Sequence, residues 1–85
     1  MKLSILYFAS LRESLGTERE SIDVPAGVAT IAELREWLCA RGGVWASALA
    51  EGRNVRAAMD QTISRHDARL HDDAEIAFFP PVTGG

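Results

Sequence analysis

The chain ends in a segment whose residue types suit chemistry at a free carboxylate. This segment reads Phe-Phe-Pro-Pro-Val-Thr-Gly-Gly and covers residues 78–85. Its two prolines favour an extended, polyproline-like path, so the segment should project from the body. The two glycines have no side chain and fit a channel too narrow for any other residue. We therefore expect a tail that enters a pocket of another protein, and it consists of Pro80, Pro81, Val82, Thr83, Gly84 and Gly85.

A carboxylate on Gly85 limits the reactions that such a tail can support. It is a poor electrophile because an oxide would have to leave, so it must first be activated, and adenylation supplies a better leaving group. The chain offers no phosphate-binding loop for that step, since Gly27 and the pair Gly42-Gly43 lack the spacing and the lysine of that motif. ATP should therefore be handled by a partner protein.

Three segments of the chain resemble a known family. The tail, with Asp60-Gln61-Thr62 and Asp73-Ala74-Glu75-Ile76-Ala77 upstream, resembles the small sulfur-carrier subunits of molybdopterin synthase, in the ubiquitin-like family of carriers. The resemblance runs from Leu3 to Gly85, and its most specific part is the tail. Asp60 departs from the family pattern, in which Asn is more common, but both residues suit a tight turn.

The resemblance implies a mechanism for the tail. In that family a separate ATP-dependent enzyme adenylates the last glycine, here Gly85, and a sulfur donor converts the adenylate to a thiocarboxylate. The thiocarboxylate donates sulfur to a cyclic pterin precursor within a heterotetramer formed with a large catalytic subunit. Two carriers in the thiocarboxylate form act for each dithiolene of molybdopterin. The chain itself is then expected to bind no cofactor and no metal and to have no active site of its own.

Bulk composition excludes several other classes of function. A net charge of -3 without a basic run argues against a surface that follows nucleic-acid phosphates. Cys39 is the only cysteine, so no internal disulfide can form, which fits the cytoplasm. The apolar run from Leu3 to Ala9 is too short for a signal peptide or a membrane span. We therefore expect a cytoplasmic protein without nucleic-acid or membrane partners.

Local patterns predict an α+β domain over residues 1–79, followed by the tail at 80–85. The main helix should begin with a capping box at Thr30 and Glu33 and end at Arg41. A second capping box, Ser10 to Glu13, predicts a short helix that Gly16 ends. The remaining predicted elements are a short helix at Val44–Ala50 and strands at Lys2–Ala9, Arg19–Val24, Val55–Met59, Thr62–Ser64 and Ala74–Phe79, with Asp60-Gln61 as a turn.

A mixed set of strands with a helix on one face is consistent with a ubiquitin-like β-grasp fold. The pattern alone indicates only the class. The resemblance implies the named fold and the strand order, in which the first and last strands are central neighbours.

Alternation along the last strand predicts a docking surface. Ile76 and Phe78 share one face, so Phe79 should be exposed on the other. Leu6 and Phe8 take the corresponding outer face of the first strand, and Ile63 is expected to join them. Because exposed apolar clusters mark interfaces, the predicted partner-binding residues are Phe8, Ile63 and Phe79.

Other readings of the sequence stay open. Gly85 could form isopeptide bonds as a protein modifier does, although Lys2 is the only lysine for linked chains. A thiamine-pathway sulfur carrier would use the same chemistry, and a passive interaction module would have an inert tail. Cys39 reads as a partly buried small residue, not a persulfide carrier, and the histidines near 66–73 read as solvated turn residues, not zinc ligands.

Overall fold

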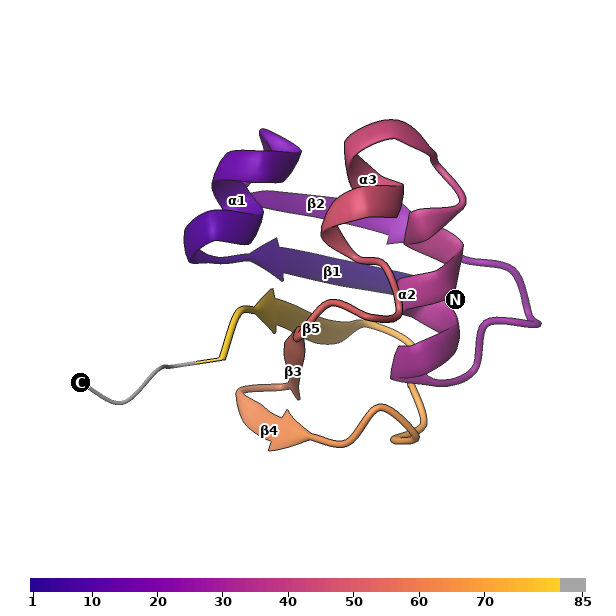
Figure 1. Ribbon diagram of the computed structural model, residues 1–85. Helices are drawn as coiled ribbons and strands as arrows, with labels where there is room; N and C mark the ends of the chain where they lie inside the picture. The colour runs from indigo at the N-terminus through magenta and orange to yellow at the C-terminus, as the bar shows by residue number, and fades with distance from the viewer. Residues whose placement is uncertain (82–85) are drawn as a thin grey trace.

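A computed structural model describes residues 1–81 of the chain, and these residues contain one mixed sheet (Figure 1). The strands are β1 (Lys2–Tyr7), β2 (Arg19–Asp23), β3 (Arg56–Met59), β4 (Thr62–Ser64) and β5 (Ala74–Phe79). Their order in the sheet is β2-β1-β5-β3-β4, with β1 and β5 parallel and the other pairs antiparallel. The last strand therefore lies at the centre of the sheet, beside the first, as predicted.

In the described part of the chain, three helices connect the strands: α1 (Ala9–Leu15), α2 (Ile31–Cys39) and α3 (Gly43–Ala48). The predicted capping box of α2 is confirmed, because the Thr30 hydroxyl accepts a hydrogen bond from the Glu33 backbone N–H at 3.2 Å and the Glu33 carboxylate accepts one from Thr30 at 3.1 Å. The helix ends at Cys39, two residues before the predicted Arg41. No helix within residues 1–81 is long and apolar enough to cross a membrane.

One face of the sheet and one stripe of α2 form the core. Alternate residues of β1 and β5 point into it, and the helix contributes residues three and four positions apart, as an amphipathic helix should. The side chains at its centre are Leu3, Ile5, Tyr7, Ile31, Leu34, Leu38, Ile76 and Phe78, each at most 1% exposed. Burial of each large apolar side chain contributes about 1.5–3 kcal/mol. The mixed sheet with α2 packed on one face confirms the predicted α+β class and the ubiquitin-like β-grasp arrangement.

The predicted capping box of α1 is wrong. The helix begins at Ala9 with Phe8 as its N-cap, and no side chain caps it, so Ser10 already lies inside the helix. The reason is a long-range pairing, because the Phe8 N–H donates to the carbonyl oxygen of Phe78 at 3.1 Å and holds the chain in the sheet up to the first helical residue. Gly16 ends this helix in the left-handed conformation, with φ of 70°, as predicted.

The strands β4 and β5 have the predicted bounds, whereas the other elements differ from the predictions by one or two residues. The first strand ends at Tyr7, two residues early, and β2 and β3 each lack one predicted end residue. The predicted helix 44–50 lies at 43–48 instead. Asp60 and Gln61 form the predicted turn of the β3–β4 hairpin, and both have positive φ, 50° and 71°.

Candidate docking site at the root of the tail

The tail starts in the middle of one end of the sheet, because it follows the central strand β5. β1 and β5 both end there, at Tyr7 and Phe79, and Phe79 is paired with Arg56 at the start of β3. Pro80 and Pro81 follow and are half-buried. We call the end of the sheet at which β1 and β5 finish the tail end. Val82, Thr83, Gly84 and Gly85 lie outside the described residues, so their predicted roles stay predictions.

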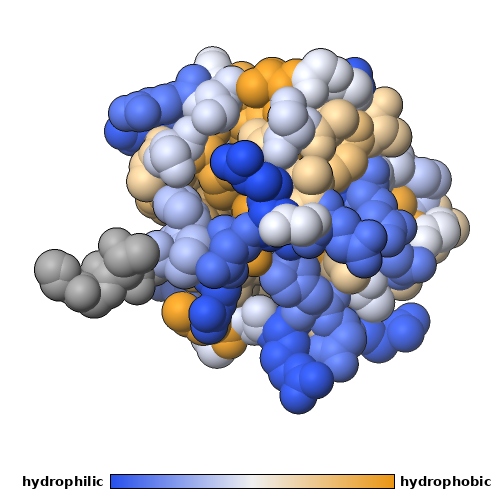
Figure 2. Space-filling model, in the orientation of Figure 1, coloured by the Kyte–Doolittle hydropathy of each residue, from blue (hydrophilic) through white to orange (hydrophobic). Residues whose placement is uncertain are grey.

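The outer face of the sheet, opposite the core, carries apolar side chains near the tail end. The pairings of Ile63 with Ala58, of Ala58 with Ala77 and of Ala77 with Leu6 place these side chains in one row across four strands. We call the larger members the outer-face patch, which consists of Leu6, Phe8, Ile63 and Phe79. Figure 2 shows hydrophobic surface beside the point where the grey segment leaves the body.

Exposure differs among the residues of the outer-face patch. Ile63 is 64% exposed and Phe8 is 46% exposed, which is high for large apolar side chains. Phe79 is half-buried, not fully exposed as predicted, because neighbouring residues lie against it and form a small open hollow with it. This hollow has a volume of about 240 Å³ and is lined by Arg56, Ile63, Phe79 and Pro81. The predicted trio thus lies on one face, and its partner-binding role stays a prediction.

Arg56 is a residue of this site that sequence reasoning does not single out. Its neighbour Ala57 is buried in the core at 1% exposure, so Arg56 takes the outer face together with Ala58. The predicted strand Val55–Met59 already contained the signal, since a charged residue before two alanines must lie on the solvent side of that strand. Its position beside Phe79 required the strand order.

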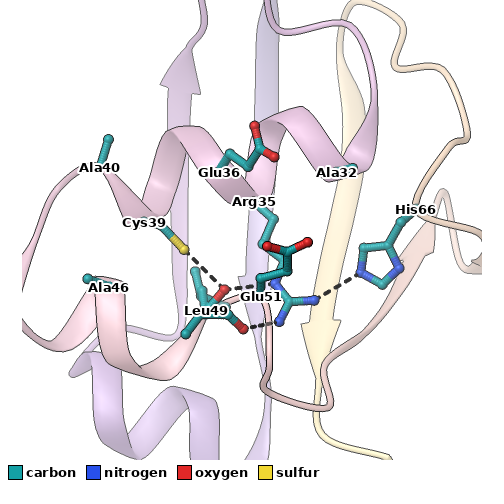
Figure 3. A pocket seen from close by; sticks show the side chains of 10 residues that line it. Ala32, Arg35, Glu36, Cys39, Ala40, Ala46, Leu49, Glu51 and His66 are labelled. Carbon is teal, nitrogen blue, oxygen red and sulfur yellow. Dashed lines mark hydrogen bonds between the residues drawn. The ribbon is translucent and has the colours of Figure 1, made fainter.

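A second, larger cavity lies between α2 and α3, away from the outer face of the sheet. It has a volume of about 590 Å³, and Figure 3 shows Arg35, Cys39 and His66 among the residues that line it. The Arg35 guanidinium donates to the carbonyl oxygens of Leu49 at 2.8 Å and Ala50 at 2.6 Å. Its donors are therefore engaged in joining α2 to the segment that follows α3.

Neither Cys39 nor the histidines form a reactive centre in the described part of the chain. The Cys39 thiol donates to the Leu49 carbonyl oxygen at 3.0 Å, and burial raises the pKa of this thiol, so its reactive thiolate form is disfavoured. His66 faces Arg35, whereas His71 contacts Asp60 on another side of the molecule. Within residues 1–81 no three His, Cys, Asp or Glu side chains are grouped to hold a metal ion.

Comparisons of the whole chain with known proteins agree with the fold. Residues 5–85 match the model of the ThiS family. The chain is 42% identical to the molybdopterin synthase sulfur carrier subunit of Escherichia coli strain K12, over 98% of this chain and 99% of the relative. It is 40% identical to the protein of the same name from Haemophilus influenzae, with the same coverage of both chains.

Solved structures with the same fold come from several organisms. A putative molybdopterin converting factor subunit 1 from Pyrococcus furiosus superposes with a TM-score of 0.78 at 27% identity, covering 96% of this chain and 99% of that one. SAMP1 from Haloferax volcanii gives 0.77 at 20% identity over both full chains. A complex of subunits 1 and 2 of the molybdopterin-converting factor from Helicobacter pylori gives 0.66 at 21% identity, also over both full chains.

The two structures near 20% identity establish the shared fold alone. The family model and the two curated relatives reach further, because they cover nearly all of the chain and the relatives are at least 40% identical to it. The chain therefore belongs to the ThiS family and, within it, to the molybdopterin synthase sulfur carrier subunits.

Proposed function

We propose that this chain carries sulfur as the small subunit of a molybdopterin synthase. The observation that supports this most strongly is the match, along almost the whole chain, to two relatives that bear the name of that subunit. The fold adds a physical reason, because the strand that leads into the tail is the central one and is held on both sides, by β1 and β3. A rigid root of this kind limits the directions that the tail can take.

The proposed reaction uses Gly85 as the point of attachment. A separate adenylating enzyme uses ATP to activate the carboxylate, and a sulfur donor replaces the adenylate to leave a thiocarboxylate. The ionised sulfur attacks an electrophilic carbon of the cyclic pterin precursor, the carbon–oxygen bond at that carbon breaks as the oxygen substituent leaves, and a thioester is formed. Water then cleaves the bond between the acyl carbon and sulfur, so that sulfur stays on the pterin and the carboxylate is regenerated. Two such cycles supply the two sulfurs of the dithiolene.

In this proposal catalysis is supplied by the partner proteins. The tail residues 80–85 enter the large subunit, in an expected heterotetramer, and the outer-face patch docks beside that entrance. The Helicobacter pylori complex of subunits 1 and 2 supports a partner of this kind. The chain binds no cofactor itself, and we expect it to work in the cytoplasm.

Intact-mass analysis of the protein from its native cell tests the proposal. We expect a fraction of the chains to have one terminal oxygen replaced by sulfur, and a tryptic peptide that ends at Gly85 should contain the change. In a reconstituted reaction, a chain whose carboxylate is blocked as an amide should deliver no sulfur. Sulfur delivery by the blocked chain would show that the tail is not the donor.

Deletion of Gly84 and Gly85 separates this function from the main alternative. Loss of molybdoenzyme activity without loss of any protein conjugates supports the sulfur carrier. Loss of conjugates in the same deletion strain would support a protein modifier, which would use the same activated glycine to form isopeptide bonds.

A further inference from the structure

The outer face of the sheet has opposite charges at its two ends. Near the tail end, Arg56 lies beside Phe79, and Arg19 is paired with Leu6. At the other end lie five acidic residues, which outnumber Lys2 and the N-terminal ammonium that binds Asp23 at 3.3 Å; they are Asp23, Asp60, Asp72, Asp73 and Glu75. The chain has a net charge of -3, so the basic character of the tail end is local and opposes the charge of the whole molecule.

The two arginines at the tail end are available to a partner. Both are exposed, and within residues 1–81 no carboxylate oxygen lies within 4.0 Å of either guanidinium. Arg41 makes a useful contrast, because it is held by Glu20 at 2.9 Å. Since an unpaired guanidinium is a planar donor that suits carboxylates, these two side chains can still form ion pairs with carboxylates of another protein.

Both arginines border the apolar residues that are expected to dock. Arg56 lines the hollow together with Ile63 and Phe79. On the opposite side, Arg19 is on the edge strand β2, next to Leu6 in the row that leads to Ile63. Charges in these positions would lie at the rim of an interface centred on the outer-face patch, as charged residues in protein interfaces usually do.

We propose that Arg19 and Arg56 form a basic rim around the outer-face patch, and that this rim selects a protein partner with carboxylates around an apolar centre. The inference rests on the proposed function and specifies the surface of the partner in that complex. Opposite charges at a rim speed association and fix orientation. The acidic end of the same face would repel a partner of this kind that approached in the reversed orientation.

Charge reversal at the rim tests the proposal with full-length chains. The probe is the purified large subunit of molybdopterin synthase from the same organism, and the association rate is measured by stopped flow. At low ionic strength, Arg56→Glu should lower the rate about tenfold, and Arg19→Glu should lower it in the same direction. The deficit should shrink at about 1 M salt, where the Debye length is about 3 Å.

Arg53→Glu is the matched control because it makes the same change in net charge. Arg53 is exposed in the segment between α3 and β3, where its carbonyl oxygen accepts from Arg35 on the helical side of the molecule. It should associate nearly as fast as the unchanged chain. Arg56→Leu keeps the apolar contact and removes the charge, so its rate should fall between those of the unchanged chain and Arg56→Glu.

Several outcomes would overturn the basic rim. Equal rates for Arg56→Glu and Arg53→Glu at low salt would show that only net charge matters, and a rate for Arg56→Leu equal to that of the unchanged chain would make Arg56 part of the apolar contact. A dimer of the chain alone that Arg56→Glu dissociates would assign this face to self-association.

The proposed function has a separate readout, which is sulfur transfer from the thiocarboxylate form. If sulfur transfer occurs while Arg56→Glu and Arg53→Glu associate at equal rates, the basic rim is contradicted and the proposed function stands. If the unchanged chain associates with neither the large subunit nor the adenylating enzyme, both proposals fail.

Discussion

Tyr7 and Glu20 are joined by a hydrogen bond of 2.8 Å from the phenol hydroxyl to the carboxylate. The same carboxylate binds both terminal nitrogens of Arg41, at 3.0 and 2.9 Å. The guanidinium of Arg41 lies 4.4 Å from the ring centroid of Trp45, and Tyr7 contacts that ring edge-on at 5.4 Å and stacks on Phe78 at 6.4 Å. This cluster connects the end of α2 to the strand that leads into the tail.

Removal of the Glu20 carboxylate should destabilise the fold. In Glu20→Ala, the hydroxyl of fully buried Tyr7 loses its acceptor and Arg41 loses its partner, so we expect a loss of about 2–3 kcal/mol in the free energy of unfolding. Tyr7→Phe removes only one hydrogen bond and should cost about 1 kcal/mol. Urea denaturation measures both values. A cost for Glu20→Ala no greater than that of Glu13→Ala, a change at an exposed residue of α1, would contradict this role.

The same carboxylate should make stability depend on acid. Partial burial acts to raise the pKa of Glu20, but the hydrogen bonds from Arg41 and Tyr7 outweigh it and hold this pKa below 4.5. A lowered folded pKa means that the stabilisation is complete above the unfolded value and is lost as the pH falls through the folded value. The stability difference between the unchanged chain and Glu20→Gln should therefore shrink at acidic pH.

The two histidines should titrate in opposite directions from the ordinary value of 6.5. The hydrogen bond of 2.6 Å to Asp60 raises the pKa of His71, whereas burial and the charges of Arg35 and Arg56 lower the pKa of His66. An NMR titration of the ring protons should give one midpoint on each side of 6.5. His71→Asn assigns the signals, and a shared midpoint would contradict the structure.

These shifts predict opposite effects on stability. The contribution of His71 should be complete below pH 6.5 and lost as the pH rises through its raised folded pKa. That of His66 should be present above pH 6.5 and lost as the pH falls through its lowered folded pKa. Thermal midpoints of His71→Asn and His66→Asn across this range would separate the two contributions.

Gln61→Gly should stabilise the protein. Gln61 has φ of 71° in the two-residue turn between β3 and β4, where both central residues are left-handed and glycine is preferred at the second position. Relief of that strain should exceed the added entropy of the unfolded chain, for a net gain of about 0.5–1 kcal/mol. A higher urea midpoint with an unchanged m-value would show it. Gln61→Val, which is β-branched, should lower the midpoint instead.

Local signals explain which elements could be predicted from the sequence. The bounds of β5 agree with the prediction because apolar residues alternate up to Phe79 and Pro80 then removes a backbone donor. The start of α2 agrees because a capping box involves only Thr30 and Glu33. Both signals lie within a few residues of the boundary that they mark.

Long-range contacts determine what the sequence could not show. Ser10 has the right neighbours for an N-cap, but the pairing of Phe8 with Phe78, 70 residues away, starts the helix earlier. Glu20 and Arg41 are 21 residues apart, and no local pattern links them. In the candidate site, alternation placed Phe79 on the outer face, whereas the hollow that it shares with Arg56 depends on which strands are neighbours.

Cys39 should be dispensable for sulfur transfer. Its thiol is half-buried, and its raised pKa leaves little thiolate at neutral pH. Labelling by iodoacetamide at neutral pH should be slower than labelling of the same chain in urea, and Cys39→Ala should transfer sulfur from the Gly85 thiocarboxylate at an unchanged rate. A persulfide on Cys39 in protein from the native cell, with loss of transfer in Cys39→Ala, would contradict this expectation.

A charge placed in the outer-face patch should abolish complex formation without unfolding the domain. Ile63 is 64% exposed, so Ile63→Asp should keep the thermal midpoint nearly unchanged and still prevent copurification with the large subunit and the adenylating enzyme. Phe79→Asp should do the same but with a measurable loss of stability, because Phe79 is half-buried.

Val44→Asp is the control for these two variants. Val44 is 43% exposed in α3, far in the fold from the outer face of the sheet, so the same change of charge there should leave both complexes intact. Normal copurification of Ile63→Asp would remove the patch from the docking surface, whereas loss of the complexes in Val44→Asp would place the interface on the helical side. Since all three chains keep the same tail, a difference among them reports on the body of the domain and not on Gly85.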